Sequence, residues 1–165
     1  MPVISTQADT EALSLTVIAE FDASAHRVWR IWADPRQLER WWGPPGYPAT
    51  FEVHEFTPTG RAGYFMTGPD GGTANGWWRF TAVEEPNRLE FDMGFANESG
   101  EPVTEMGTAH AVVTLEETGG RTRMAIVSTF ESAGQQEKML AMGMEEGMGE
   151  AVGQIDSLLA ESPAA

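Results

Sequence analysis

The sequence predicts an α+β fold in which an antiparallel sheet is covered by a long C-terminal helix. Between residues 49 and 131, alternating apolar and polar segments are joined by short turns, the pattern of antiparallel hairpins. Residues 133–161 instead repeat apolar side chains at the helical period. A helix and a sheet that each carry one apolar face bury both faces when the helix lies across the sheet.

A strand and two short helices precede the hairpins. Residues 13–21 alternate apolar and polar side chains, which predicts a half-buried strand. Ser24 stands at an N-cap position before a helical repeat that ends at Pro35. Asp34 and Pro35 are then the expected cap and first residue of a second helix. This helix ends in the Trp-Trp-Gly-Pro-Pro segment that begins at Trp41, because glycine and proline do not continue it.

Six further strands are expected in three hairpins, and the register of two hairpins follows from their apolar residues. A slip of one residue in either would place large apolar groups opposite charged ones. The hairpins are 49–57 with 61–67, 76–83 with 88–96, and 106–117 with 122–131. The expected partners are Ala82 with Leu89, Phe80 with Phe91 and Trp78 with Met93, then Leu115 with Met124, Val113 with Ile126, Ala111 with Ser128 and Ala109 with Phe130.

Composition restricts the class of partner and the compartment. The chain has 165 residues, 10 Lys+Arg against 25 Asp+Glu, a formal net charge of −15 and no cysteine. This length suits one domain over residues 1–165, with a core over about 12–161. The acidic excess argues against nucleic acid or a membrane as partner, because its field repels phosphates. Lacking a signal-peptide pattern and an apolar run of membrane-spanning length, the protein is expected to be cytoplasmic.

Four segments that span most of the chain carry a resemblance to a known family. They are Phe21-Asp22-Ala23-Ser24 through Trp41-Trp42-Gly43-Pro44, Glu55–Gly60 leading to Met66–Gly71, Glu84–Leu89, and Gly143–Met148. With these segments the chain resembles the single-domain bacterial proteins of the START/Bet v 1-like (SRPBCC) superfamily. Within it, the chain is similar to the group named after the C-terminal domain of the activator of Hsp90 ATPase (AHSA1). Thr57 stands where that group often has an arginine.

The resemblance implies a helix-grip fold. In this fold a curved antiparallel sheet of about seven strands wraps around the long C-terminal helix, with two short helices after the first strand and a cavity between sheet and helix. The superfamily includes lipid and hormone carriers, aromatic cyclases, oxygenase subunits and co-chaperone domains. The fold therefore does not fix a chemistry.

The sequence contains no recognisable metal, cofactor or catalytic motif. His26, His54 and His110 lie on separate expected elements, without partners at metal-ligand spacing. The glycine-rich run that begins at Gly68 lacks the lysine of a phosphate loop, and there is no Gly-x-Ser-x-Gly nucleophile turn. We expect no metal, no cofactor and no catalytic residue set. His110 is expected to face solvent.

Arg79 and Asp92 stand among apolar strand residues. The predicted register places both on the sheet face opposite Phe80 and Phe91, where they would form a surface salt bridge. The alternative places Arg79 inside the cavity, holding a ligand carboxylate or enolate. That alternative needs a partner such as Asp92 or a bound anion, since a buried unpaired arginine is costly. Glu55 and Tyr64 are the other polar candidates for the cavity.

Aromatic and methionine side chains give the strongest functional indication. The chain has six Trp, eight Phe and nine Met. Trp29, Trp32 and Phe21 are expected to pack in the core. Because methionine is flexible and polarizable, a wall rich in it adapts to different apolar ligands. The candidates for the cavity wall are Trp41, Trp42, Tyr47, Trp78, Phe80, Phe91, Phe95, Met144 and Met148.

These observations favour a protein that binds a small hydrophobic or aromatic molecule between the sheet and the C-terminal helix. One alternative is an enzyme of the polyketide cyclase or hydrolase type that uses the same cavity, with Arg79, Glu55 or Tyr64 as its polar group. Another is a co-chaperone-like interaction module whose acidic surface docks on a basic partner such as a chaperone. Trp41 and Trp42 would also suit a homodimer contact.

Overall fold

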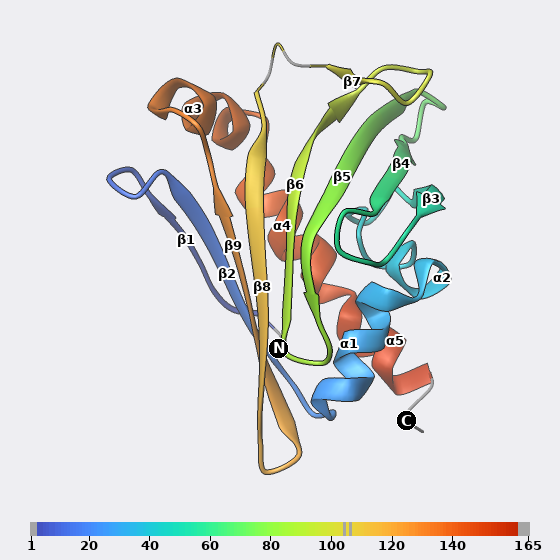
Figure 1. The fold of residues 1–165 in the computed structure, drawn as a ribbon, viewed down its shortest axis with the longest axis vertical. Coiled ribbons are helices and arrows are strands. Elements are labelled where there is room, and N and C mark those ends of the chain that lie inside the picture. The colour runs from blue at the N-terminus through green and yellow to red at the C-terminus, as the bar shows by residue number, and fades with distance from the viewer. Residues whose placement is uncertain (1–2, 104, 106, 162–165) are drawn as a thin grey trace.

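The computed structural model describes residues 3–103, 105 and 107–161, and within them one antiparallel sheet has nine strands. The strand order is β1-β2-β9-β8-β6-β5-β4-β3, with β7 paired to β6 (Figure 1). The strands are β1 (Val3–Asp9), β2 (Ser14–Phe21), β3 (Ala49–His54), β4 (Arg61–Thr67), β5 (Thr73–Glu84), β6 (Arg88–Ala96), β7 (Pro102–Val103), β8 (Ala109–Thr118) and β9 (Arg121–Thr129).

The predicted fold class is confirmed, and two strands were not predicted. β1 is an edge strand that pairs with β2, and Thr6 donates a hydrogen bond from Oγ1 to Glu145 Oε2 at 3.0 Å. The position of β1 therefore depends on contacts with segments that are distant in the sequence. β7 has two residues and no pattern of its own. The expected strand 106–117 begins at a residue outside the described ones, and β8 starts at Ala109.

The predicted registers are confirmed at most pairs. Trp78 faces Met93 and Phe80 faces Phe91, and three of the four predicted β8–β9 pairs are present. The fourth, Ala109 with Phe130, is not part of the ladder, because β9 ends at Thr129. Ala82, however, faces Glu90, and Leu89 faces Val83. A bulge between Phe80 and Ala82 adds one residue to β5, which shifts the pairing toward the turn.

Both N-terminal helices begin where their caps predict. The Ser24 side chain accepts a hydrogen bond from the Arg27 N–H at the start of α1 (Ala25–Ala33). The Asp34 side chain does the same for Arg36 at the start of α2 (Pro35–Leu38), with Pro35 as first residue. These side chains satisfy N–H groups that have no partner inside the helix.

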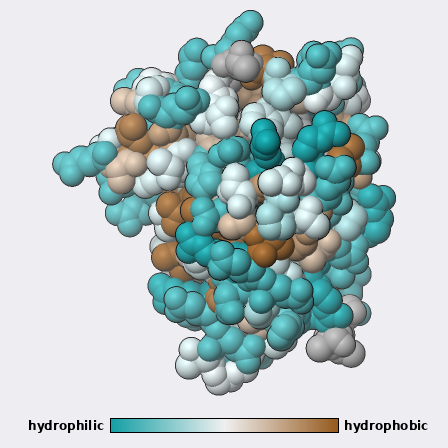
Figure 2. All heavy atoms as spheres, in the orientation of Figure 1, coloured by the Kyte–Doolittle hydropathy of each residue, from teal (hydrophilic) through white to brown (hydrophobic). Residues whose placement is uncertain are grey.

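The C-terminal helix is present but consists of three consecutive segments, α3 (Ala133–Ala141), α4 (Met144–Gly153) and α5 (Ile155–Glu161). Gly143 interrupts it with a φ of +89°, a left-handed conformation that favours glycine. Figure 1 shows α4 passing behind β6 and β8, on one face of the sheet. We call this face the inner face. The opposite, outer face is mostly hydrophilic, with separated apolar patches (Figure 2).

Two apolar clusters fill the inner side of the sheet. The larger joins the sheet to α1, α2 and α5 and contains Trp32, Trp78 and Phe91. The smaller contains Leu15, Ala109, Phe130 and Met139. The half-buried side chains of Met93 and Met148 pack against both clusters. These methionines therefore mark the junction between two fully buried regions.

Candidate functional site

Five of the nine wall candidates lie within one buried aromatic cluster on the inner face: Trp41, Trp42, Trp78, Phe80 and Phe91. Trp78 stacks on Phe91 with ring centroids 4.2 Å apart, and Trp42 meets Trp78 edge-on at 4.7 Å. Trp32, expected only as core packing, contacts Trp41, Trp42, Trp78 and Phe91. The aromatic residues of α1, of the turn that follows α2, and of β5 and β6 thus form one continuous cluster.

The other four wall candidates lie elsewhere. Phe95, Met144 and Met148 are half-buried against the smaller cluster. Tyr47 is 47% exposed in the loop before β3. Met66 and Met93, which were not among the predicted wall residues, are half-buried on the larger cluster. Their strand positions alternate with outward-facing residues, and that alternation was the signal that would have identified them.

Three indole N–H groups of the aromatic cluster are buried without a hydrogen-bond partner among the described residues. They belong to Trp32, Trp42 and Trp78. Trp41 differs, because its Nε1 donates to the Ile31 carbonyl at 3.0 Å. A buried donor without an acceptor is disfavoured, and most buried polar groups in proteins are paired. An oxygen atom brought into this region would therefore be stabilised.

Tyr64 places a hydroxyl beside these donors. Burial raises the pKa of the Tyr64 hydroxyl, while the nearby indoles of Trp42 and Trp78 act to lower it. Neither indole N–H reaches good hydrogen-bond geometry. The phenol lies over Gly76 of the adjacent strand, where an added Cβ would stand 2.4 Å from the hydroxyl oxygen. Of the three polar candidates, Tyr64 is the one that reaches the inner face.

Arg79 and Glu55 lie outside the interior. Arg79 is exposed on the outer face, opposite Asp92 as the register predicts. The predicted salt bridge between them is not formed within the described residues; instead, Asp92 Oδ1 lies 2.8 Å from Nδ1 of His110. Glu55 is exposed in the β3–β4 turn, where its carboxylate accepts the Arg61 backbone N–H.

The environments of two histidines shift their pKa values in opposite directions. His54 is half-buried, with Nε2 3.1 Å from the Trp32 carbonyl, and its loss of solvation lowers the pKa. For His110, partial burial acts to lower the pKa, but hydrogen bonds to Asp92 and Glu90 outweigh it and raise the value. Over the described part of the chain, no group of three or more His, Asp or Glu side chains is arranged to hold a metal ion.

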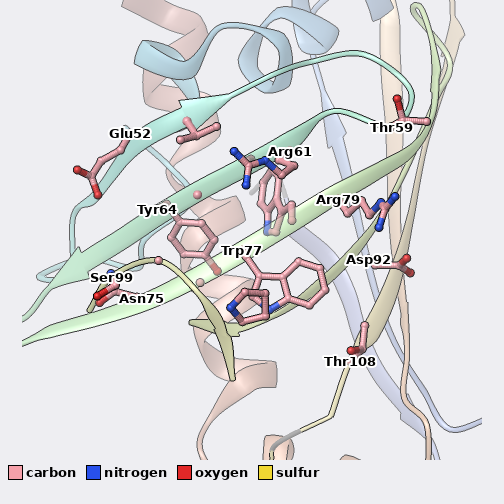
Figure 3. Close-up of a pocket in the computed structure, with 17 residues that line it drawn as sticks. Glu52, Thr59, Arg61, Tyr64, Asn75, Trp77, Arg79, Asp92, Ser99 and Thr108 are labelled. Atoms are coloured by element: carbon pink, nitrogen blue, oxygen red, sulfur yellow. The ribbon is translucent and has the colours of Figure 1, made fainter. Parts of the chain in front are cut away.

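A groove of about 910 Å³ lies on the outer face, over β3–β6 and the segment around β7 (Figure 3). Its floor is the half-buried Trp77, and Arg61, Arg79, Asn75 and Asp92 are among its lining residues. No pattern in the sequence indicated this groove. Trp77 pairs with Gly63 on one side and Gly94 on the other, so small residues flank it on both neighbouring strands.

An antiparallel sheet wrapped around a C-terminal helix, with two short helices after β2, defines a helix-grip domain. Residues 22–160 match the family model described as Activator of Hsp90 ATPase homolog 1-like protein. The chain belongs to this family. The expected resemblance is thereby confirmed.

Solved structures similar to this chain come from several bacteria. A solution NMR structure of a protein from Arthrobacter aurescens is 63% identical, with a TM-score of 0.93 over 96% of this chain and 92% of that chain. A crystal structure of a Mycobacterium smegmatis protein is 47% identical, with a TM-score of 0.89 over 96% and 97%. A Rhodobacter sphaeroides protein at 23% identity and a TM-score of 0.80, over 96% and 97%, shares the fold.

No curated protein sequence matches the chain. Among the described helices, none combines the length and the apolar character needed to cross a membrane. The cytoplasmic location, a homodimer and a chaperone contact stay predictions. Trp41 and Trp42, however, are buried in the core and are not exposed for the homodimer contact expected of them.

Proposed function

We propose that the protein binds a small hydrophobic or aromatic molecule between the inner face of the sheet and the C-terminal helix. The observation that carries the proposal is the set of three buried indole N–H groups, of Trp32, Trp42 and Trp78, that have no well-aligned hydrogen-bond acceptor among the described residues. Leaving a buried donor unsatisfied costs about 1–3 kcal/mol. A ligand oxygen that accepts from one of them removes that cost while the rest of the ligand contacts aromatic rings.

The half-buried methionines supply the route to this region. Met93 and Met148 lie between the two buried clusters, and Met66 lies next to the larger one. Methionine changes shape at low cost, so these side chains can separate to admit a ligand. On α4, an added Cβ at Gly147 would meet no atom within 4 Å, so the space beside this residue, next to Met148, is open.

The donors also indicate the chemistry of the ligand. Indole N–H groups only donate, so the ligand must present an acceptor such as a carbonyl or phenolate oxygen. The surrounding Trp78, Phe91 and Phe51 rings favour a flat apolar body. A flavone or a polyketide-like aromatic ketone combines both features.

Ligand binding is tested by thermal shift and tryptophan fluorescence with three probes: flavone, 1,4-naphthoquinone and palmitate. We expect the two aromatic ketones to bind and to raise the melting temperature. Trp42→Phe removes one donor and keeps an aromatic ring, and it should weaken flavone binding about threefold to tenfold. Trp29→Phe is the matched control, because the Trp29 nitrogen is not among the buried unpaired donors.

Blocking the route gives a second test. Met148→Trp fills the junction between the clusters and should abolish flavone binding, whereas Met142→Trp, at a position 62% exposed, should not. Absence of binding tighter than about 1 mM by all three probes would overturn the proposal. So would equal flavone affinities for the Met148→Trp and Met142→Trp variants.

A further inference from the structure

The outer groove contains an aromatic platform held flat against the sheet. An added Cβ on Gly94 would stand 2.7 Å from Nε1 of Trp77 and about as close to its neighbouring ring carbons, so the indole lies directly on the Gly94 backbone. Figure 3 shows this ring in front of the strands, with Asn75 and Ser99 at one end of the groove and Arg79 and Asp92 at the other. The indole nitrogen of Trp77 is buried and has no partner among the described residues.

Two arginines stand beside this platform without close neutralisation. Arg61 and Arg79 are direct partners across β4 and β5, and like charges in such positions repel. The ion pairs of the described residues do not include Arg79, and Arg61 approaches Glu55 only at 3.9 Å. Both arginines are exposed, so their guanidinium groups are accessible to a ligand from solvent.

The two acidic residues that line the groove form no ion pair with Arg61 or Arg79. Asp92 lies opposite Arg79, but its Oδ1 is 2.8 Å from Nδ1 of His110. Glu52 lines the groove from β3 and takes no part in the ion pairs of the described residues. An added anion is therefore the group that relieves the repulsion between the two arginines. Arginine binds carboxylates through paired N–H donors, which gives both strength and orientation.

We propose that the outer groove binds a small aromatic carboxylate, whose ring stacks on Trp77 and whose carboxylate is held by Arg79 and Arg61. Residues 77 and 79 point to the same face of β5, so ring and charge lie side by side. This site lies on the opposite face of the sheet from the site of the proposed function and does not depend on it.

The test is a titration of the 15N-labelled full chain with 2-naphthoate, with the neutral analogue 2-naphthalenemethanol and the cation 2-naphthylmethylammonium in parallel. Loss of one indole signal in Trp77→Phe assigns the Trp77 N–H resonance. We expect 2-naphthoate to shift this resonance and to bind at least tenfold tighter than either analogue. Arg79→Gln should weaken 2-naphthoate at least tenfold. Arg121→Gln, at an exposed arginine on β9, should weaken it less than twofold and controls for net charge.

Equal binding of the three naphthalene compounds, or tighter binding of the cation, would overturn the proposal. Equal losses of 2-naphthoate affinity in Arg79→Gln and Arg121→Gln would also overturn it. Shifts confined to the Trp42 and Trp78 indoles would place 2-naphthoate in the interior, which rejects the outer site and leaves the proposed function standing. Conversely, if flavone fails to bind, 2-naphthoate should still shift the Trp77 N–H resonance. The two proposals can therefore be rejected independently of each other.

Discussion

The phenol ring of Tyr64 occupies the place that Gly76 leaves by having no side chain. The two residues are cross-strand partners in β4 and β5, and an added Cβ at residue 76 would stand 2.4 Å from both Cζ and the hydroxyl oxygen of Tyr64. A Cβ atom is essentially never found this close to a non-bonded atom. Tyr64 therefore keeps its position only while residue 76 is glycine. The position of the one interior hydroxyl candidate therefore depends on a glycine in the neighbouring strand.

Gly76→Ala is expected to destabilise the protein by about 1–3 kcal/mol, the range for overpacking a core, because it displaces the Tyr64 ring. Urea denaturation measures the change in the free energy of unfolding. Gly63→Ala is the matched control, since its Cβ would lie 3.8 Å from the Val53 Cβ, an ordinary contact. An equal loss of stability in both variants would show that the tyrosine contact is not the cause.

Gly143→Ala is expected to cost about 1–2 kcal/mol of stability, because alanine must adopt the left-handed backbone that ends α3 and begins α4. Gly147→Ala should instead increase the stability of the protein. It lies inside α4 with no atom within 4 Å of an added Cβ, and alanine is favoured over glycine in a helix by about 1 kcal/mol. The melting temperatures of both variants, measured against that of the wild type, test these expectations. A stabilising Gly143→Ala would contradict the assigned break.

His110 is expected to titrate above the ordinary histidine value, because Asp92 and Glu90 hydrogen-bond to its two ring nitrogens. A raised pKa in the folded state means that the native protein binds the proton more tightly than the unfolded chain does. The stabilisation is then fully present below about pH 6.5 and is lost as the pH rises through the folded pKa. NMR titration of the imidazole signals measures this. Asp92→Asn should lower the His110 pKa, and an unchanged value would contradict the assignment.

His54 is expected to show the reverse dependence. Loss of solvation lowers its pKa, so the unfolded chain binds the proton first as the pH falls below about 6.5. This histidine therefore destabilises the fold as the pH falls from that value toward its own lower pKa. Denaturation from pH 7.5 to 5 measures the effect, and His54→Phe, which keeps an aromatic ring beside Phe56 and Phe80, should reduce the loss. A variant that loses as much stability as the wild type over this range would reject the explanation.

Local patterns identified most of the fold because the relevant interactions are near in sequence. Ser24 and Asp34 cap helices through N–H groups two or three residues away, and the hairpin registers follow from alternation within each strand. The bulge after Phe80 could not be predicted from alternation, because the alternation continues on both sides of the one inserted residue. β1 was not predicted either, since its sequence VISTQAD has no regular apolar–polar alternation and its pairing with β2 and contact with α4 belong to the tertiary structure.

For the candidate site, the sequence determined which residue types are present and which face of each strand they occupy. It therefore placed Arg79 opposite Asp92 and Phe80 opposite Phe91. Tertiary structure decided the partners: Asp92 meets His110 from β8, and the indoles of Trp32, Trp42 and Trp78 have no acceptor among the described residues. The alternation of a strand fixes a direction for each side chain. Hydrogen bonds and ion pairs, however, require distances of a few ångströms between chain segments that only the complete packing sets.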